Sequence, residues 1–177
     1  MSHLLFSDNM KNIFFILFMS FGALSAQGTF RIFDAQMNDV TSGVIYLVDT
    51  NSAQMQVSLT VENTDSVPHN VTAGRLVISQ PSGASNAFIW GMTQYPPSVD
   101  SSGIAEYMNP TATAAFEGYY FPNNNGGIAT INYCFWETTD MNNNSCVTVT
   151  YDNYFPAGVG APLESGAPIV TYGPNPA

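Results

Sequence analysis

The sequence predicts an all-β domain, either a sandwich or a barrel, and three observations carry that prediction. Short runs rich in Val, Ile, Thr, Tyr and Phe alternate with clusters of Gly, Pro, Asn, Asp and Ser, the pattern of strands separated by turns. No helical stretch of useful length follows residue 27. Hydrophobic residues make up 45% of the chain and aromatic residues 13%, which is enough to drive collapse into a core and excludes intrinsic disorder.

Each strand is expected where an apolar run is bounded by turn residues. The predicted strands are Thr29–Asp34, Gly43–Val48, Gln54–Glu62, Asn70–Ser79, Ala87–Trp90, Thr111–Phe121, Ile128–Glu137 and Ser145–Asn153. Apolar and polar residues alternate strictly along Gln54–Glu62, which indicates a half-buried antiparallel strand. Pro96-Pro97 lies in the loop from Gly91 to Gly103, so no regular ladder is expected there. The last two strands should form a hairpin with a long loop at Thr138–Asn144.

The N-terminus has the three parts of a signal peptide. Lys11 precedes the apolar run Ile13–Met19, and Ser20–Ala26 ends in small residues, so cleavage is expected after Ala26. A transmembrane anchor is the alternative, but the run is shorter than the ~20 residues that span a bilayer. Translation from Met10 would leave the same signal. We therefore expect a signal peptide at 1–26, one domain at 27–155, and no stable membrane span after cleavage.

Charge is scarce and strongly one-sided. Only 9% of the residues are charged, with 3 Lys+Arg against 13 Asp+Glu, and the formal net charge is −10. Beyond the signal peptide, the basic side chains are Arg31 and Arg75. So few cations cannot neutralise a phosphate backbone or an anionic membrane, and both classes of partner are excluded.

The two cysteines are predicted to form a cross-strand disulfide. Cys134 and Cys146 fall on the outer faces of the two predicted hairpin strands, and a hairpin centred on Asp140 sets them directly opposite each other. Two free thiols are the alternative, which export disfavours. A zinc site is a poor third, because His69 is the only histidine left after cleavage and two more ligands would be needed.

No residue pattern indicates catalysis. His69 sits in a Pro-containing turn, where a solvated loop residue is the usual interpretation, and no Gly-x-Ser-x-Gly elbow accompanies it. Glycoside hydrolysis needs two carboxylates a few Å apart, but the candidate acids show no spacing signature. These acids are Glu106, Glu117, Glu137 and Asp140. We expect no enzyme.

Two other kinds of site stay open. Asp34, Asn38, Asp39 and Asp140 are hard-oxygen residues in turns and are candidate calcium ligands, although ordinary solvated turns are the favoured interpretation and no cofactor is required. Flat rings among neutral polar residues suit a sugar-binding face. The candidate aromatics are Trp136, Tyr95 and Trp90. For Trp90 the core is favoured, whereas for Trp136 the two interpretations are close.

The C-terminus resembles an export signal. Pro174-Asn175-Pro176-Ala177 is similar to the opening of the type A C-terminal sorting domain of Bacteroidota, which directs proteins through type IX secretion. The preceding residues 156–171 are rich in Gly, Ala and Pro and are expected to be a linker. On this resemblance, residues 172–177 are the start of a sorting domain, and the type IX export machinery is a partner.

The body of the chain, residues 29–154, resembles a secreted β-sandwich module that accompanies this sorting domain. The similarity rests on the order of several short motifs: Val61–Asp65, Ala87–Gly91, Gly118–Asn123, Ile128–Phe135 and Val147–Asp152. Those modules often flank Trp-Gly with two cysteines, where this chain has Ile89 and Gln94. The resemblance implies an immunoglobulin-like antiparallel β-sandwich of about seven to nine strands. It also implies an extracellular or outer-surface location and carries no activity. We therefore expect a non-enzymatic interaction module with a glycan or a surface protein as partner; the alternative is a carbohydrate-binding module that uses the exposed aromatics, with or without calcium.

Overall fold

A computed structural model describes residues 29–50 and 52–153 of the chain. These residues form ten strands and no helix. The predicted signal peptide at 1–26, the linker at 156–171 and the sorting motif at 172–177 lie outside the described residues. Within the described part, no helix has the length and hydropathy needed to cross a membrane.

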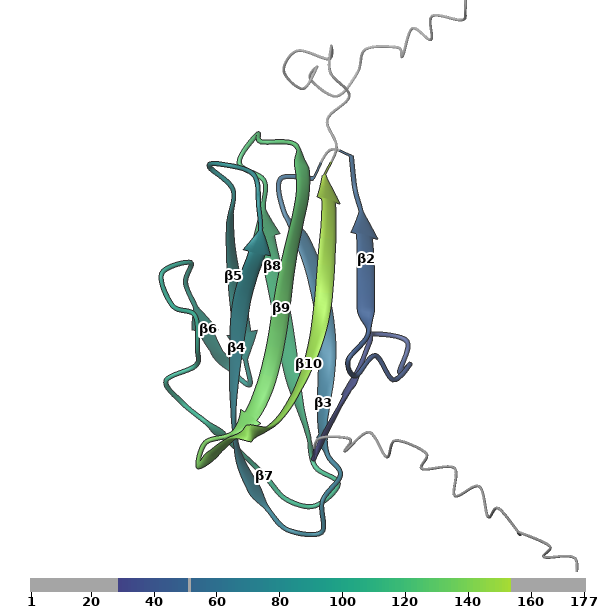
Figure 1. The fold of residues 1–177 in the computed structure, drawn as a ribbon, viewed down its shortest axis with the longest axis vertical. Coiled ribbons are helices and arrows are strands. Elements are labelled where there is room, and N and C mark those ends of the chain that lie inside the picture. The colour runs from purple at the N-terminus through teal and green to yellow at the C-terminus, as the bar shows by residue number, and fades with distance from the viewer. Residues whose placement is uncertain (1–28, 51, 154–177) are drawn as a thin grey trace, which may run out of the picture.

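Two five-stranded sheets pack face to face (Figure 1). Sheet A runs in the order β1 (Phe30–Phe33), β3 (Met55–Asn63), β8 (Thr113–Phe121), β5 (Ser85–Trp90) and β6 (Thr93–Tyr95). Sheet B runs in the order β2 (Val44–Val48), β10 (Asp140–Asn153), β9 (Gly127–Glu137), β4 (His69–Ser79) and β7 (Glu106–Met108). The predicted immunoglobulin-like β-sandwich is confirmed.

Three details differ from the prediction. β2 pairs with β10 in parallel, so the sandwich is not wholly antiparallel. The loop around Pro96-Pro97 contains β6, which pairs with β5 and ends before the first proline, and β7 is a second unpredicted strand of three residues. The final hairpin turns at Thr138–Thr139 instead of through a long loop, and a bulge between Asp140 and Asn144 absorbs the extra residues.

The core lies between the sheets and follows the period-two pattern of the strands. Met55, Val57, Leu59 and Val61 of β3 are buried, as the alternation predicts. Aromatic rings from both sheets fill the centre. They include Phe88, Trp90, Phe116, Tyr133 and Phe135. A Cβ on Gly118 would lie 2.6 Å from the Tyr133 hydroxyl oxygen, so the glycine makes room for this ring where the sheets face each other.

Arg75 points into this core instead of toward solvent. Its side chain is 1% exposed, and its guanidinium donates hydrogen bonds to the carbonyl oxygens of Asn86 and, at 2.6 Å, Pro97. The guanidinium carbon also lies 5.7 Å from the ring centre of Phe88. Arg75 therefore ties β4 of sheet B to β5 and to the proline loop of sheet A.

The predicted disulfide is confirmed. Cys134 of β9 and Cys146 of β10 are direct partners in the ladder, with Cα atoms 4.1 Å apart, and a disulfide joins their sulfur atoms. Both residues belong to the outer face of sheet B, because their sequence neighbours Phe135 and Val147 are buried. The bond links two strands that already pair, and it closes a short loop.

Removal of the disulfide should destabilise the fold moderately. We expect a Cys134→Ser/Cys146→Ser variant to lose about 2–3 kcal/mol of unfolding free energy, because a short closed loop restricts the unfolded chain only moderately. Urea unfolding measures the difference. Reduction of the native chain should reproduce the loss and leave the double variant unchanged. Equal stability of oxidised and reduced chains would contradict the expected contribution.

Candidate functional site

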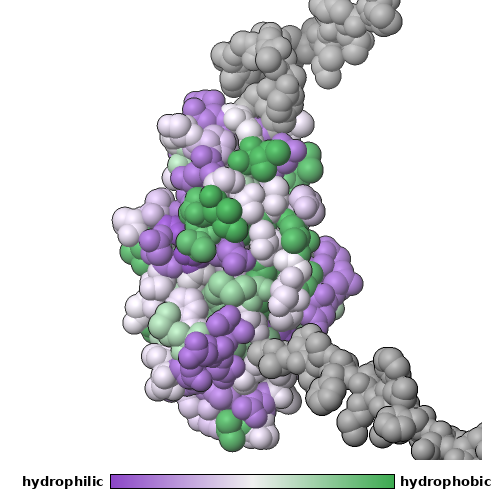
Figure 2. Space-filling model, in the orientation of Figure 1, coloured by the Kyte–Doolittle hydropathy of each residue, from purple (hydrophilic) through white to green (hydrophobic). Residues whose placement is uncertain are grey.

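The outer face of sheet B is a large and nearly uncharged surface. Its exposed apolar side chains include Val44, Tyr46 and Val48 of β2, Leu76 of β4 and Ile128 of β9. Figure 2 shows green apolar residues in separate clusters over the molecule, with pale and purple, more hydrophilic residues between them. Of the outward residues along β2, β10, β9 and β4 in the ladders, only Asp152 carries a charge.

The ladder register sets these residues in rows across the sheet. Val44 lies beside Thr148, which lies beside Asn132 and then Leu76. A second row places Tyr46 beside Thr150 and Thr130. Threonine and asparagine thus separate an apolar edge on β2 from Leu76 on β4. Polar groups that lack charge can hydrogen-bond a ligand, while the apolar edges supply contact area.

Sheet A presents a different outer face. Arg31 of β1 stands beside Glu62 of β3, and Glu117 projects from β8. The sequence does not show this division, because the charges of both sheets are scattered along the chain. The structure therefore separates a charged face from a neutral one.

Trp136 lies on the outer face of sheet B and is half-buried there. A Cβ on Gly74 would lie 2.5 Å from Cη2 of Trp136, so the six-membered part of the indole rests on the glycine backbone. Gly74 is the ladder partner of Cys134, which sets the ring next to the disulfide. Trp136 therefore has features of both interpretations. Its ring packs on the backbone of Gly74, where β4 has no side chain, and it is still partly accessible to a ligand.

The other two candidate aromatics are core residues. Trp90 is fully buried, and its Nε1 donates a 3.0 Å hydrogen bond to the carbonyl of Val71. Tyr95 is also buried, because its ring stacks on Phe88 with 4.9 Å between ring centres. The hypothesis that Tyr95 faces a ligand is wrong, and the preference for a core position of Trp90 over a ligand-facing one is confirmed.

The candidate calcium ligands bond within their own turns. One Asp34 carboxylate oxygen accepts 2.9 Å hydrogen bonds from the backbone amides of Gln36 and Asn38, and the other accepts one from the Asn38 side chain. That side-chain hydrogen bond is the main reason why the pKa of Asp34 is lowered. Asp39 bonds the Thr41 amide, and Asp140 the Asn142 amide. Among the described residues, no three His, Cys, Asp or Glu side chains gather as metal ligands.

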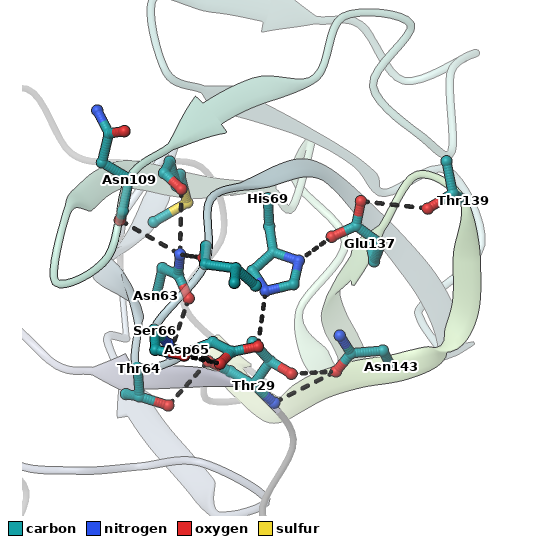
Figure 3. Close-up of polar contacts among 12 residues, drawn as sticks. Thr29, Asn63, Thr64, Asp65, Ser66, His69, Asn109, Glu137, Thr139 and Asn143 are labelled. Carbon is teal, nitrogen blue, oxygen red and sulfur yellow. Dashed lines mark hydrogen bonds and ion pairs between the residues drawn. The ribbon is translucent and has the colours of Figure 1, made fainter.

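His69 forms a polar cluster at the β7 end of the sandwich (Figure 3). Its Nδ1 contacts a carboxylate oxygen of Glu137, the last residue of β9, and its Nε2 lies 3.0 Å from Oδ2 of Asp65. The histidine side chain is only 12% exposed, so the interpretation as a solvated loop residue is wrong. The imidazole joins the β3–β4 turn to the end of β9.

Both ring nitrogens of His69 are engaged, and this limits the chemistry of the cluster. A general base needs one ring nitrogen free to accept a proton from a nucleophile. In this cluster, carboxylates occupy both positions. The hydrogen bond from His69 is also the main reason why the pKa of Asp65 is lowered. The arrangement therefore fits a role in closing this end of the sandwich.

Asn63 completes the closure of the same end. Its side-chain amide donates hydrogen bonds to the carbonyl oxygens of Val67 at 2.9 Å and Met108 at 3.0 Å. The turn between β3 and β4 is thereby fixed to the end of β7 (Figure 3). The sequence offers little sign of this, because an asparagine beside a turn usually bonds locally.

Tyr119, on the outer face of sheet A, supplies a titration that tests the side-chain geometry. Its hydroxyl donates to the Glu117 carboxylate, and this hydrogen bond is the main reason why the pKa of the phenol is raised to about 12. In a Glu117→Gln variant the pKa should fall toward the ordinary value of about 10. Ultraviolet absorbance at high pH follows ionised tyrosine. A Glu62→Gln control should leave the titration unchanged, and an unchanged curve for Glu117→Gln would contradict the contact.

Similarity to one solved domain supports the fold, and two further structures are similar at lower scores. The N-terminal domain of PorA superposes with a TM-score of 0.52 at 10% sequence identity, over 70% of this chain and 96% of that domain. PapD-like domain 7 of human CEP192 superposes with a TM-score of 0.42 at 8% sequence identity, over 73% of this chain and 88% of that domain. CfaE, the adhesive subunit of the CFA/I fimbria of enterotoxigenic Escherichia coli, superposes with a TM-score of 0.37 at 10% sequence identity. The match covers 72% of this chain and 50% of CfaE. No protein-family profile and no curated protein matches the sequence.

Proposed function

We propose that this chain is a secreted or cell-surface module that acts by binding and is exported through type IX secretion. The neutral outer face of sheet B carries the proposal. Exposed apolar side chains and uncharged polar groups share this face, and a single carboxylate interrupts it. Such a surface suits contact with another macromolecule better than chemistry on a small substrate.

The disulfide and the terminal motifs support the location. A bond between Cys134 and Cys146 persists in oxidising compartments, which include the periplasm and the exterior of the cell. Residues 1–26 have the signal-peptide pattern, and Pro174–Ala177 resemble the start of a sorting domain. Together they favour an extracellular or outer-surface destination.

Export is tested in a Bacteroidota host with and without a working type IX pore. In the competent host, antibodies against the domain should label intact cells or the medium. In the pore-deficient host, the protein should stay in the periplasm, with its disulfide formed. Equal surface labelling in both hosts would contradict type IX export.

Binding through the face is tested by adding charge to it. A Thr130→Glu/Thr150→Glu variant places two carboxylates that neighbour each other in the ladder on sheet B. A Gln56→Glu/Ser58→Glu variant adds the same charge to sheet A. The labelled chain should bind producer cells that lack their own copy. The sheet B variant should lose this binding and the sheet A variant should keep it; the reverse result would contradict the assignment.

Carbohydrate binding is a second candidate, and the placement of Trp136 favours it. The indole rests on Gly74 and has Thr72 and Asn144 as ladder neighbours, so a flat ring lies among neutral polar groups. A glycan array with and without calcium, run on the native chain and on Trp136→Ala, tests this function. Loss of a glycan signal in the variant would support it, and absence of any signal would refute it.

A further inference from the structure

Strand β2 leaves one side of its backbone without a partner among the described residues. The amide of Thr148 donates to the carbonyl of Gly43, and the amide of Asp49 donates to the carbonyl of Asp152, each at 3.0 Å. In a parallel ladder, alternate residues face the neighbouring strand. Ile45 and Leu47 therefore bond β10, whereas the N–H and C=O groups of Val44, Tyr46 and Val48 point away from the sheet.

The side chains of β2 are incompletely covered as well. Val44, Tyr46 and Val48 are 52%, 73% and 71% exposed on the outer face. On the inner face, Ile45 and Leu47 pack against the core but are only partly buried. An additional strand beside β2 would cover both sets at once, because its own side chains would alternate between the two faces.

This edge lacks the features that usually prevent strand addition. β2 contains no charged residue, no proline and no bulge over Val44–Val48. Natural sheets protect an exposed edge with lysine, proline, a bulge or a covering loop. At the opposite edge of sheet B, short β7 and a bridge from Gly74 to Ser101 cover β4. Within residues 29–50 and 52–153, β2 is thus the open edge of the sheet that carries the neutral face.

We propose that β2 binds an extended segment of a basic partner polypeptide, which adds to sheet B as an antiparallel strand. The inference rests on the proposed binding function and specifies the chemical class of the partner, a basic polypeptide in extended conformation. The added strand would exchange backbone hydrogen bonds with Val44, Tyr46 and Val48. Apolar residues of the partner would continue the core beside Ile45 and Leu47, and a lysine or arginine near its N-terminal end would lie beside Val48 and extend its long side chain over Val48 toward Asp152.

Charge decides between this partner and a second copy of the chain. Two β2 strands could pair antiparallel about Tyr46 and match apolar residues on both faces. Each copy, however, carries a net charge of −10, and like charges oppose close association. Two carboxylates lie at this end of β2: Asp152, the ladder partner of Val48, and Asp49, which directly follows Val48 in the sequence. A basic segment gains attraction from the same charges that would repel a second copy.

A synthetic peptide tests the inference on the purified chain. The probe is fluorescein-labelled Lys-Lys-Val-Thr-Val-Thr-Val, and fluorescence polarisation should give a Kd on the order of 100 μM, because one short strand buries less area than a stable interface. A Glu-Glu-Val-Thr-Val-Thr-Val peptide should bind at least tenfold more weakly. A Lys-Lys peptide with proline at its central valine should not bind.

Three variants distinguish peptide binding at the β2 edge from non-specific binding elsewhere on the surface. Tyr46→Pro removes an amide that points away from β10, so the strand keeps its ladder and the Lys-Lys peptide should lose at least tenfold in affinity. Val48→Lys places a cation beside Asp152; it should weaken the Lys-Lys peptide and strengthen the Glu-Glu peptide. Leu76→Lys adds the same charge on β4, at the far side of the face, and should change affinity less than twofold.

The outcomes distinguish the occupants. Peptide binding with the charge reversal at Val48→Lys supports the inference even if Tyr46→Pro fails to fold. Equal binding of both peptides, no binding, or equal effects of Leu76→Lys and Val48→Lys would overturn it. So would a dimer in analytical ultracentrifugation that Val48→Lys disrupts, because a second copy would then be the occupant. Failure of type IX export would leave the peptide assay unaffected and would count only against the export route.

Discussion

Replacement of Arg75 by methionine should lower the unfolding free energy by about 2–4 kcal/mol, a substantial part of the stability of a single domain. The guanidinium is buried and donates to the carbonyl oxygens of Asn86 and Pro97. Methionine fills much of the volume but cannot donate, so these carbonyl oxygens lose their partner. A buried unpaired acceptor costs about 1–3 kcal/mol, and the contact with Phe88 also changes.

Arg31 provides the matched control. Arg31→Met changes the net charge by the same amount, but its side chain is 47% exposed and its nearest acid, Asp39, is 3.9 Å away. An exposed pair of this kind contributes little, so the variant should stay within about 0.5 kcal/mol of the native chain. Urea unfolding of both variants measures the contrast. Equal losses would contradict the buried position of Arg75.

Replacement of Trp90 by alanine should cost about 3–5 kcal/mol, the range for a large aromatic residue removed from a core. The ring is fully buried between the sheets, with its centre 5.2 Å from that of Phe135. Its Nε1–H also satisfies the carbonyl of Val71, which would lose this partner. Denaturant unfolding followed by circular dichroism gives the value without reliance on tryptophan emission.

Trp136→Ala tests the same residue type on the outer face. Its ring covers Gly74 and is only half-buried, so the loss should be about 1 kcal/mol. A loss as large as that of Trp90→Ala would contradict the surface position. A glycan or partner lost in Trp136→Ala, with the fold intact, would identify the indole as a contact residue.

The sequence was most informative where a strand has one buried and one exposed face. Alternation along Met55–Val61 predicted β3 because its polar residues face water at every second position. The same parity argument placed Cys134 and Cys146 on one face, but their direct pairing also required a hairpin centred on Asp140, which parity does not decide. In both cases, the alternation of neighbouring residues shows which face of the sheet a side chain occupies.

Arg75 could not be predicted in this way. Its acceptors are backbone carbonyls that β5 and the proline loop bring to it, and a carbonyl oxygen leaves no trace in a residue pattern. β4 therefore turns a charged residue inward while Leu76 remains exposed. His69 is similar, because one of its two carboxylate partners, Glu137, comes from the end of a strand 68 residues away.

The edge position of β2 could not be predicted either, because its sequence pattern indicates a different position in the sheet. The run Val44–Val48 has no polar residue, and an uninterrupted apolar run is typical of a strand buried on both faces. The parallel pairing with β10 instead places it at the margin of sheet B. A strand with the composition of a central strand thus lies at an open edge, and its composition suits the addition of another strand.

Amide hydrogen exchange at β2 is the most direct measurement of this open edge. In the free chain, the amides of Ile45 and Leu47 should be protected by β10, whereas those of Val44, Tyr46 and Val48 should exchange readily. Saturation with Lys-Lys-Val-Thr-Val-Thr-Val should protect the latter three. Protection of these three amides before the peptide is added, or their free exchange at saturation, would contradict strand addition at β2.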